Sequence, residues 1–457
     1  QQSNPSNILM RLGSLSKSYT WLSLLQLVDN GALSLDDPIR NHLPKNLQST
    51  TPSTNRPILI RHLIDGRHGW ENPDFIQHSL NNSQGIPTLS EYLQNRSPDA
   101  IYPPGLRANS IDFSAAITGT IIAEKYNLPF EAAMEEVLFA SMDVQNTTFR
   151  EPMADGRISA LPMGDQHRFL ERALWDGANW HALPFQYHSD RAPAMSASAT
   201  LDDIQSLLRV LLNFEDAGQK ILSRQMWEGI ANEKNMFGFS NYQYGSFKGF
   251  GQRSVEAGLS SQFIIFREQQ LALFVVSNGG NSHIIDKLPR HILKRYFPEA
   301  LSNRALQKAV PSKTKELEGF YRTTNRPHSG ISMAIANILG LSHISMNEHG
   351  HLYEQSLRDN HSWSPISDHH FANNTTGQFI VFNEDINAHQ GFQKNKPLAY
   401  FEKLPILQSP LVLAGAFTIL ILTSGAIITL QTRALLTHRA QILSLIHISE
   451  PTRPNNI

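Results

Sequence analysis

The decisive stretch reads Arg11-Leu-Gly-Ser-Leu-Ser-Lys-Ser-Tyr-Thr20, and it continues through Leu24-Leu-Gln-Leu-Val-Asp-Asn-Gly31. Its apolar residues recur at i, i+3, i+4 and i+7, which is the spacing of an amphipathic helix. These residues are Trp21, Leu24, Leu25 and Val28. Asn30-Gly31 predicts the end of the helix, because these residue types readily adopt the left-handed conformation that stops one. We therefore expect a helix from Ser14 to about Asn30. We also expect helices over Ser114 to Tyr126 and Leu201 to Phe214, and a buried hairpin from Gln262 to Asn278, where two apolar runs flank the polar turn at Arg267 to Gln270.

Ser14 and Lys17 lie one helical turn apart in this stretch, in the pattern Ser-x-x-Lys. Residues at i and i+3 share a helix face, so the Lys17 amine can approach the Ser14 hydroxyl. A serine hydroxyl becomes a good nucleophile when a nearby base takes its proton. Backbone N–H groups at a helix N-terminus also stabilise developing negative charge. The pattern predicts Ser14 as a nucleophile and Lys17 as its base.

Further segments give this motif a context: Leu35-Asp-Asp-Pro-Ile39, Ile60-Arg-His-Leu-Ile64, Pro103-Pro-Gly105, Ala192-Pro-Ala-Met-Ser-Ala-Ser-Ala199 and Gly258-Leu-Ser-Ser261. Together with the first stretch, they resemble the serine β-lactamase and penicillin-binding-protein superfamily, in particular class C β-lactamase-related, membrane-anchored serine hydrolases. The resemblance covers about residues 10 to 290. It implies an α+β fold, with an antiparallel sheet flanked by helices and a helical subdomain. It also implies an acyl-serine intermediate formed on an ester, amide or β-lactam, often from a cell-wall peptide, without a cofactor.

The second motif of that superfamily, Tyr-x-Asn or Ser-x-Asn, is altered here to Ser110-Ile111-Asp112. The resemblance implies that Ser110 relays a proton between Ser14 and the leaving group. Asp112 stands where the family has an asparagine that binds substrate, and an ionised carboxylate cannot donate a hydrogen bond. A carboxylate near Lys17 also favours the ammonium form, which weakens Lys17 as a base.

The third motif, Lys-Thr-Gly or His-Gly-Gly, is altered to Gln252-Arg253-Ser254. Arg253 offers a cation for a substrate carboxylate, although adjacent strand residues face opposite sides. Ser254 adds a side chain where the family has none. The resemblance implies an oxyanion hole formed by the Ser14 N–H and a backbone N–H near Val255. We expect Glu256 in an exposed loop.

Two functional hypotheses follow from these substitutions. In the first, the protein is a working serine hydrolase with a changed substrate preference. In the second, it is a catalytically impaired relative that binds cell-wall peptides without turnover, because losing one proton-transfer or oxyanion group costs about a hundred- to ten-thousand-fold in rate. A purely structural membrane protein is a third and less favoured hypothesis, since Ser14 and Lys17 are both present.

The chain has 457 residues, and its amino-acid composition changes along its length. We predict a hydrolase domain over 1–300, a small β-rich module over 313–405 and a transmembrane helix over 409–432. Leu411–Leu430 has twenty uncharged residues, enough to cross a hydrocarbon layer of about 30 Å. This span predicts a cell-membrane protein, and the resemblance implies that its hydrolase domain is extracytoplasmic. Residues 443–457 resemble a non-native tail, and we expect a leading segment to be missing before Gln1.

Composition excludes several classes of function. The net charge is −1, so no basic surface predicts a nucleic-acid partner. The chain has no cysteine, which excludes disulfides and thiolate zinc sites. Six histidines between His343 and His370 lack the spacing typical of a zinc site, so we expect no metal. The expected partner is therefore a small molecule or a cell-wall peptide.

Overall fold

The structure is a computed structural model of the full chain. It describes residues 7–52, 56–75, 80–153, 160–161, 167–230, 237–279, 282–301, 315–357, 360–382, 391–394, 399–410, 412, 418–419 and 422–436. The chain divides into two compact units, 1–403 and 404–457. The predicted boundaries at 300, 313 and 405 stay predictions.

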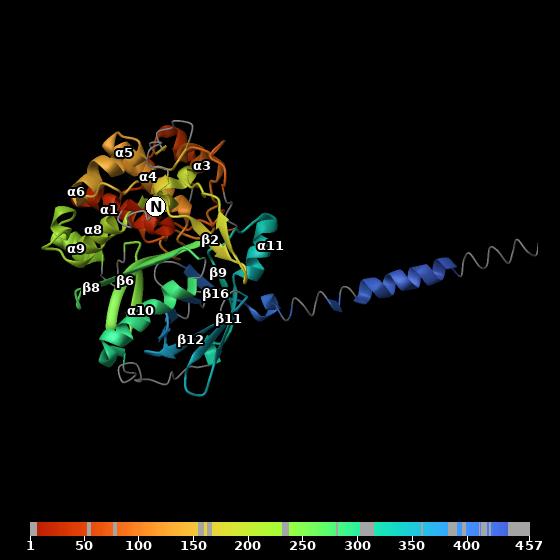
Figure 1. Ribbon diagram of the computed structural model, residues 1–457. Coiled ribbons are helices and arrows are strands. Elements are labelled where there is room, and N and C mark those ends of the chain that lie inside the picture. Colours follow the sequence, from red (N-terminus) through yellow and green to blue (C-terminus); the bar gives the residue numbers. More distant parts are fainter. Residues whose placement is uncertain are drawn as a thin grey trace, which may run out of the picture. The chain divides into compact units, whose positions relative to one another are not determined.

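An antiparallel sheet of four strands forms the centre of the first part of the chain, in the order β5-β6-β7-β8 (Figure 1). The strands are β5 (Ser240–Tyr244), β6 (Phe247–Glu256), β7 (Leu259–Phe266) and β8 (Leu271–Ser277). Successive side chains of a strand point to opposite faces. In β7, Phe263 and Ile265 pack into the main core, whereas Ile264 and Phe266 pack with Leu293 on the other face. Because both faces are covered, every residue of β7 is buried.

Helices cover both faces of this sheet. Leu293 belongs to α10 (Ser282–Tyr296), which contacts β7 and β8. Figure 1 shows α4, α5 and α6 together on the other side of β6 from α10. The helices of this region are α1 (Ser16–Asp29), α2 (Ile60–Ile64), α3 (Leu89–Asn95), α4 (Asp112–Tyr126), α5 (Phe130–Ala133), α6 (Ala140–Met142), α7 (Ala192–Met195), α8 (Leu201–Leu212) and α9 (Arg224–Ile230).

Several elements agree with the sequence-based expectations. The helices expected over 14–30, 114–126 and 201–214 correspond to α1, α4 and α8. The hairpin expected over 262–278 is formed by β7 and β8, which join through the polar turn at Arg267 to Gln270. Trp21, Leu24 and Leu25 are buried in the core, as their helical spacing predicts. Two small ladders complete this region: β1 (Met10–Arg11) with β4 (Ser198–Ala199), and β2 (Arg172–Trp175) with β3 (Trp180–Leu183).

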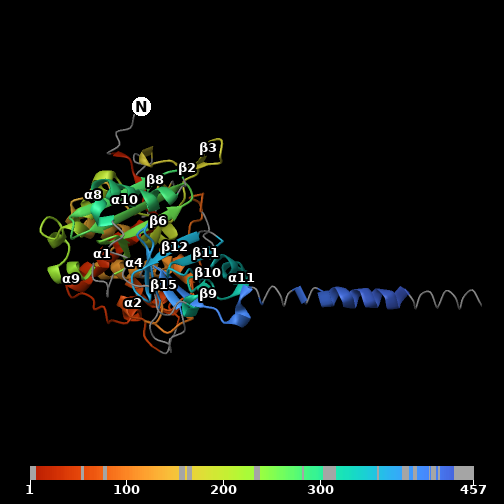
Figure 2. The ribbon, with the colours of Figure 1, turned by 90° about the horizontal axis from the view of Figure 1, so that it is seen from below.

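The small β-rich segment forms a closed antiparallel barrel, and Figure 2 shows its strands β9, β10, β11, β12 and β15 close together. Its strands are β9 (Gly319–Thr323), β10 (Leu341–Met346), β11 (Leu352–Ser356), β12 (Asn360–Pro365), β13 (His370–Ala372), β14 (Phe379–Phe382), β15 (Gly391–Lys394) and β16 (Ala399–Lys403). One helix, α11 (Gly330–Leu339), joins β9 to β10. Aromatic side chains fill the interior, as expected for a barrel of eight strands.

The transmembrane helix expected over 409–432 is not found in the structure and stays a prediction, because part of this span lies outside the described residues. Among the residues that the structure describes, no helix has both the length and the apolar character needed to cross a membrane. Within the expected span, residues 411, 413–417 and 420–421 lie outside the described residues. The expected non-native tail over 443–457 lies outside them entirely.

Candidate active site

Ser14 lies in a 3-10 turn, Gly13–Leu15, that leads directly into α1. Gly13 has a φ of +51°, a left-handed conformation that glycine adopts at little cost. A Cβ atom at this position would also overlap the Glu256 carboxylate and the Ser254 hydroxyl. The turn can therefore approach β6 closely only because residue 13 is glycine. This approach holds Ser14 against the strand that carries the altered third motif.

The structure brings most of the predicted site residues to one small cavity of about 180 Å³. Its walls are formed by Ser14, Lys17, Asn72, Asp74, Ser110, Ile111, Asp112, Gln252, Arg253 and Asn325. The predicted nucleophile, base and proton relay thus face a common space, although they come from the start of α1 and the segment before α4. Ser254 adjoins this cavity through a bond to Ser14, whereas Val255 is not among the described residues of the cavity wall. The roles assigned to these residues stay predictions.

Lys17 and Asp112 form a buried ion pair inside the cavity. The Lys17 Nζ lies 2.7 Å from Asp112 Oδ1, and the two side chains are 7% and 12% exposed. The other oxygen of Asp112 lies 3.4 Å from the Arg191 guanidinium. Burial opposes ionisation of Asp112, but the Lys17 and Arg191 charges outweigh it and hold the pKa of this carboxyl below its usual value. Asp112 also begins α4, where the helix dipole favours a negative charge.

This ion pair has a chemical consequence for Ser14. The hydrogen bond of the Ser14 hydroxyl goes to the Met195 sulfur at 3.4 Å, and a thioether is a weak acceptor. Lys17 directs its ammonium to Asp112, so in this arrangement it is not a proton acceptor for Ser14. The sequence predicted that a carboxylate at Asp112 would favour the ammonium form of Lys17 and weaken it as a base. The contact between Lys17 and Asp112 agrees with that prediction.

The Ser254 hydroxyl is bound to the Ser14 backbone N–H, the group that is expected to stabilise an oxyanion. The Ser14 N–H donates a hydrogen bond to Ser254 Oγ at 2.9 Å. Ser254 is only 4% exposed, so its hydroxyl is held within the protein. A substrate oxyanion can use the Ser14 N–H only after this hydroxyl rotates away. A glycine at position 254 would leave the donor available.

The other residues of the third motif divide between the two faces of β6. Gln252 is 3% exposed and lies on the same side as Ser254, so an uncharged amide stands at the position where the family has its cation. Arg253 forms a two-pronged ion pair with Asp286 of α10, at 2.8 Å for each bond. Val255, on the Arg253 side, is 45% exposed. The cation proposed for substrate binding is thus already paired with a carboxylate.

Glu256 and His188 are parts of the site region that the sequence reasoning missed. The expectation that Glu256 lies in an exposed loop is wrong, because it ends β6 and its side chain is only 5% exposed. His188 Nε2 lies 3.1 Å from a Glu256 oxygen, and His188 Nδ1 lies 3.4 Å from the Arg191 guanidinium. Burial opposes ionisation of Glu256, but the hydrogen bond and charge of His188 outweigh it and lower its pKa.

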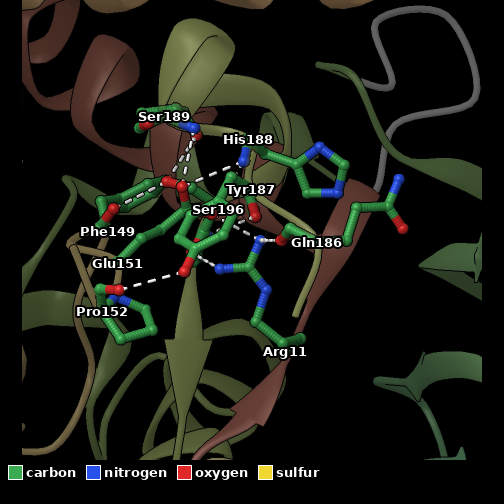
Figure 3. Close-up of polar contacts among 12 residues, drawn as sticks. Arg11, Phe149, Glu151, Pro152, Gln186, Tyr187, His188, Ser189 and Ser196 are labelled. Carbon is green, nitrogen blue, oxygen red and sulfur yellow. Dashed lines mark hydrogen bonds and ion pairs between the residues drawn. The ribbon is translucent and has the colours of Figure 1, made fainter. Parts of the chain in front are cut away.

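A buried ion pair supports the segment that carries His188 (Figure 3). Arg11 lies 2.6 Å from Glu151, and the two side chains are 4% and 0% exposed. Glu151 accepts hydrogen bonds from the backbone N–H groups of His188 and Ser189, at 2.8 to 3.0 Å. Since Arg11 lies three residues before Ser14, this pair connects the nucleophile turn to the segment that leads to Arg191.

Asn72, Asp74 and Asn325 are further cavity residues that no sequence pattern indicated. Asn325 follows β9, so the barrel segment contributes directly to the cavity wall. In the described part of the chain, no group of three or more histidine, aspartate or glutamate side chains is arranged to hold a metal ion. The polar groups that line the cavity are hydroxyls, an amine, a guanidinium, carboxylates and amides.

A family model described as beta-lactamase matches residues 1–294. The chain belongs to the beta-lactamase family. A beta-lactamase from Yersinia enterocolitica is 25% identical over 149 residues, which are 32% of this chain and 35% of that protein. The match thus spans about a third of the relative's length.

Two solved structures extend the similarity beyond the family match. The crystal structure of SurE covers 87% of this chain and 88% of its own, with 17% identity and a TM-score of 0.55. The octameric penicillin-binding protein homologue from Pyrococcus abyssi covers 88% of this chain and 89% of its own, with 15% identity and a TM-score of 0.51. At these identities the likeness concerns the fold alone.

Proposed function

We propose that the protein is a serine hydrolase that acts through an acyl-serine intermediate, with Ser14 as nucleophile. One observation carries the proposal: Ser14, Lys17 and Ser110 line the same cavity. A hydroxyl, an amine and a second hydroxyl are the groups that nucleophilic attack and proton transfer require. The substrate class is an ester, amide or β-lactam with an accessible carbonyl, and cell-wall peptides are the natural source that the family favours.

In the reaction, the Ser14 oxygen attacks the substrate carbonyl, and its proton passes to the neutral amine of Lys17, directly or through the Ser110 hydroxyl. Ser110 then passes a proton to the leaving group as the carbonyl–heteroatom bond breaks, which leaves the acyl group on Ser14. Water releases the acyl group in the second half of the reaction. The Ser14 N–H stabilises the oxyanion when the Ser254 hydroxyl has moved away.

Two side chains limit the rate in this proposal. Asp112 keeps the Lys17 amine in an ion pair at 2.7 Å, so acylation requires this pair to separate or another base to act. Ser254 accepts from the Ser14 N–H at 2.9 Å, so the oxyanion competes with an internal hydrogen bond. Removing one such donor or proton acceptor costs about a hundred- to ten-thousand-fold in rate. We therefore propose slow acylation compared with relatives that retain the family motifs.

A second candidate function is peptide binding without turnover. The same contacts favour it, because both the base and the oxyanion donor have internal partners. In this alternative the cavity binds the peptide, and Ser14 is never acylated.

Covalent labelling distinguishes the two functions. The 457-residue protein is incubated with a fluorescent penicillin and, separately, with a fluorescent ester probe, beside the Ser14→Ala and Ser16→Ala variants. Ser16 is a matched control, since it is two residues away and its buried hydroxyl accepts from the Ala197 N–H. The hydrolase proposal predicts labelling of the wild type that Ser14→Ala abolishes and Ser16→Ala retains. Absence of labelling by both probes, in a folded protein, favours the binding function.

A further inference from the structure

A second cavity adjoins the candidate active site. Its volume is about 250 Å³, and it opens beside the barrel. Its lining includes Thr323, Leu339, Ser342 and Glu354, together with Lys394 of β15. Phe75, from the hydrolase region, also lines it, so both parts of the first compact unit contribute to its walls. Asn325 lines this cavity and the active-site cavity alike. The two spaces therefore share a wall.

Hydrogen bonds hold the shared wall in place. The Asn72 side chain donates to the Asn325 side-chain oxygen at 2.7 Å. The Asn72 backbone N–H donates to the Arg326 carbonyl at 3.1 Å, and the Asn325 N–H donates to the Thr323 hydroxyl at 3.1 Å. Glu71 accepts from the His328 backbone N–H. The loop after β9 is thus fixed to the segment around Asn72, next to the cavity that contains Ser14.

The lining of the second cavity mixes polar side chains with apolar ones, and its ionisable residues are Lys394, Glu354 and His361. Lys394 lies 3.1 Å from Glu354, and the Lys394 side chain is 21% exposed whereas that of Glu354 is 2% exposed. The Ser342 hydroxyl also donates to Glu354, at 3.0 Å. The carboxylate therefore lies deepest and is satisfied internally, while the ammonium is the more accessible partner. Lys394 Nζ donates to both Glu354 oxygens, at 3.1 and 3.3 Å, and the third N–H of the ammonium can bind an external acceptor.

Size indicates that the cavity holds part of a larger ligand. Pockets that bind a whole drug-sized molecule measure about 300 to 1,000 Å³. The cavities of about 180 and 250 Å³ are each smaller than this range. A substrate that reacts at Ser14 and continues past Asn325 would use both.

We propose that the second cavity binds the carboxylate-bearing end of a peptide, with Lys394 as the ligand for the carboxylate and Phe75 beside the adjoining apolar side chain. This inference rests on the proposed function for its assignment as a substrate subsite. The carboxylate binding itself is independent of acylation. Charge-assisted hydrogen bonds of this kind favour an anionic ligand over its neutral counterpart.

Equilibrium binding of two matched probes tests the proposal. Calorimetric titration of the 457-residue protein compares N-acetyl-L-phenylalanine with N-acetyl-L-phenylalaninamide, which has no carboxylate. We expect the acid to bind at least about tenfold more tightly, as one charged hydrogen bond permits. The double variant Lys394→Met/Glu354→Gln should lose this preference, because it removes both charges without leaving one buried and unpaired. Lys220→Met, at an exposed lysine outside the cavity, should retain it.

Two results would overturn the proposal: equal affinity for the acid and the amide in the wild type, or an unchanged preference in the folded double variant. Neither result depends on labelling of Ser14. If Ser14 is not acylated but the preference for the acid is lost with Lys394, the carboxylate site stands and the hydrolase proposal fails. If Ser14 is acylated but the acid has no advantage, only the carboxylate site is refuted.

Discussion

Replacing Glu151 by glutamine should destabilise the protein strongly, because it leaves the Arg11 guanidinium buried without its counter-ion. The pair is 2.6 Å long, with side chains 4% and 0% exposed. Breaking a buried ion pair by removing one partner typically costs about 3 to 5 kcal/mol. Glutamine retains an acceptor for the His188 and Ser189 N–H groups, so these hydrogen bonds persist in part. We therefore expect a loss of about 3 kcal/mol in the free energy of unfolding.

The chain contains a matched control for this measurement. Arg61 and Asp36 form a pair of the same length, 2.6 Å, but their side chains are 41% and 69% exposed. Exposed pairs contribute about 0 to 1 kcal/mol, so Asp36→Asn should change stability little. Urea unfolding of Glu151→Gln, Asp36→Asn and the wild type measures both effects. Equal losses in the two variants would refute the argument that burial of the pair determines its contribution.

Three further predictions follow from the buried residues. Burial lowers the pKa of His68 to about 3, so the unfolded chain binds a proton below its usual pKa of 6.5 whereas the folded protein does not. The stability should therefore fall by about 2 kcal/mol from pH 7 to pH 5 through this group, and His68→Gln should flatten that part of a urea-unfolding pH profile. Arg191→Met should cost about 3 to 5 kcal/mol in urea unfolding, because Asp190 and Asp112 lose their shared cation; a loss below about 1 kcal/mol would contradict this. Gly13→Ala should lower the melting temperature because of its φ of +51° and the overlap with Glu256; an unchanged melting temperature would refute the need for glycine.

The helices and the sheet follow from local patterns. Periodic apolar residues indicated α1, and the two apolar runs joined by Arg267 to Gln270 indicated the β7–β8 hairpin. The spacing of Ser14 and Lys17 predicted a shared face, and both line one cavity. Such patterns can be recognised in the sequence because they depend on residues that lie close together in the chain.

The rest of the site depends on contacts between distant segments. Asn325 reaches the cavity from the barrel, and no local pattern marks it. Glu256 was expected to be exposed, but strand alternation places it on the same face as Gln252 and Ser254, against Gly13. The pairing of Arg253 with Asp286 joins β6 to α10. None of these contacts follows from sequence spacing, because each depends on how the elements pack.

The rate at which Ser14 is acylated in the double variant Asp112→Asn/Ser254→Gly tests the central claim most directly. Asparagine removes the charge that binds Lys17, and glycine removes the hydroxyl that accepts from the Ser14 N–H. Stopped-flow or gel-based labelling with the fluorescent ester probe, followed by mass mapping of the peptide that contains Ser14, gives this rate. We predict acylation at least about tenfold faster than in the wild type. An equal or slower rate at Ser14 in the folded double variant would contradict the claim that these two side chains restrain the site.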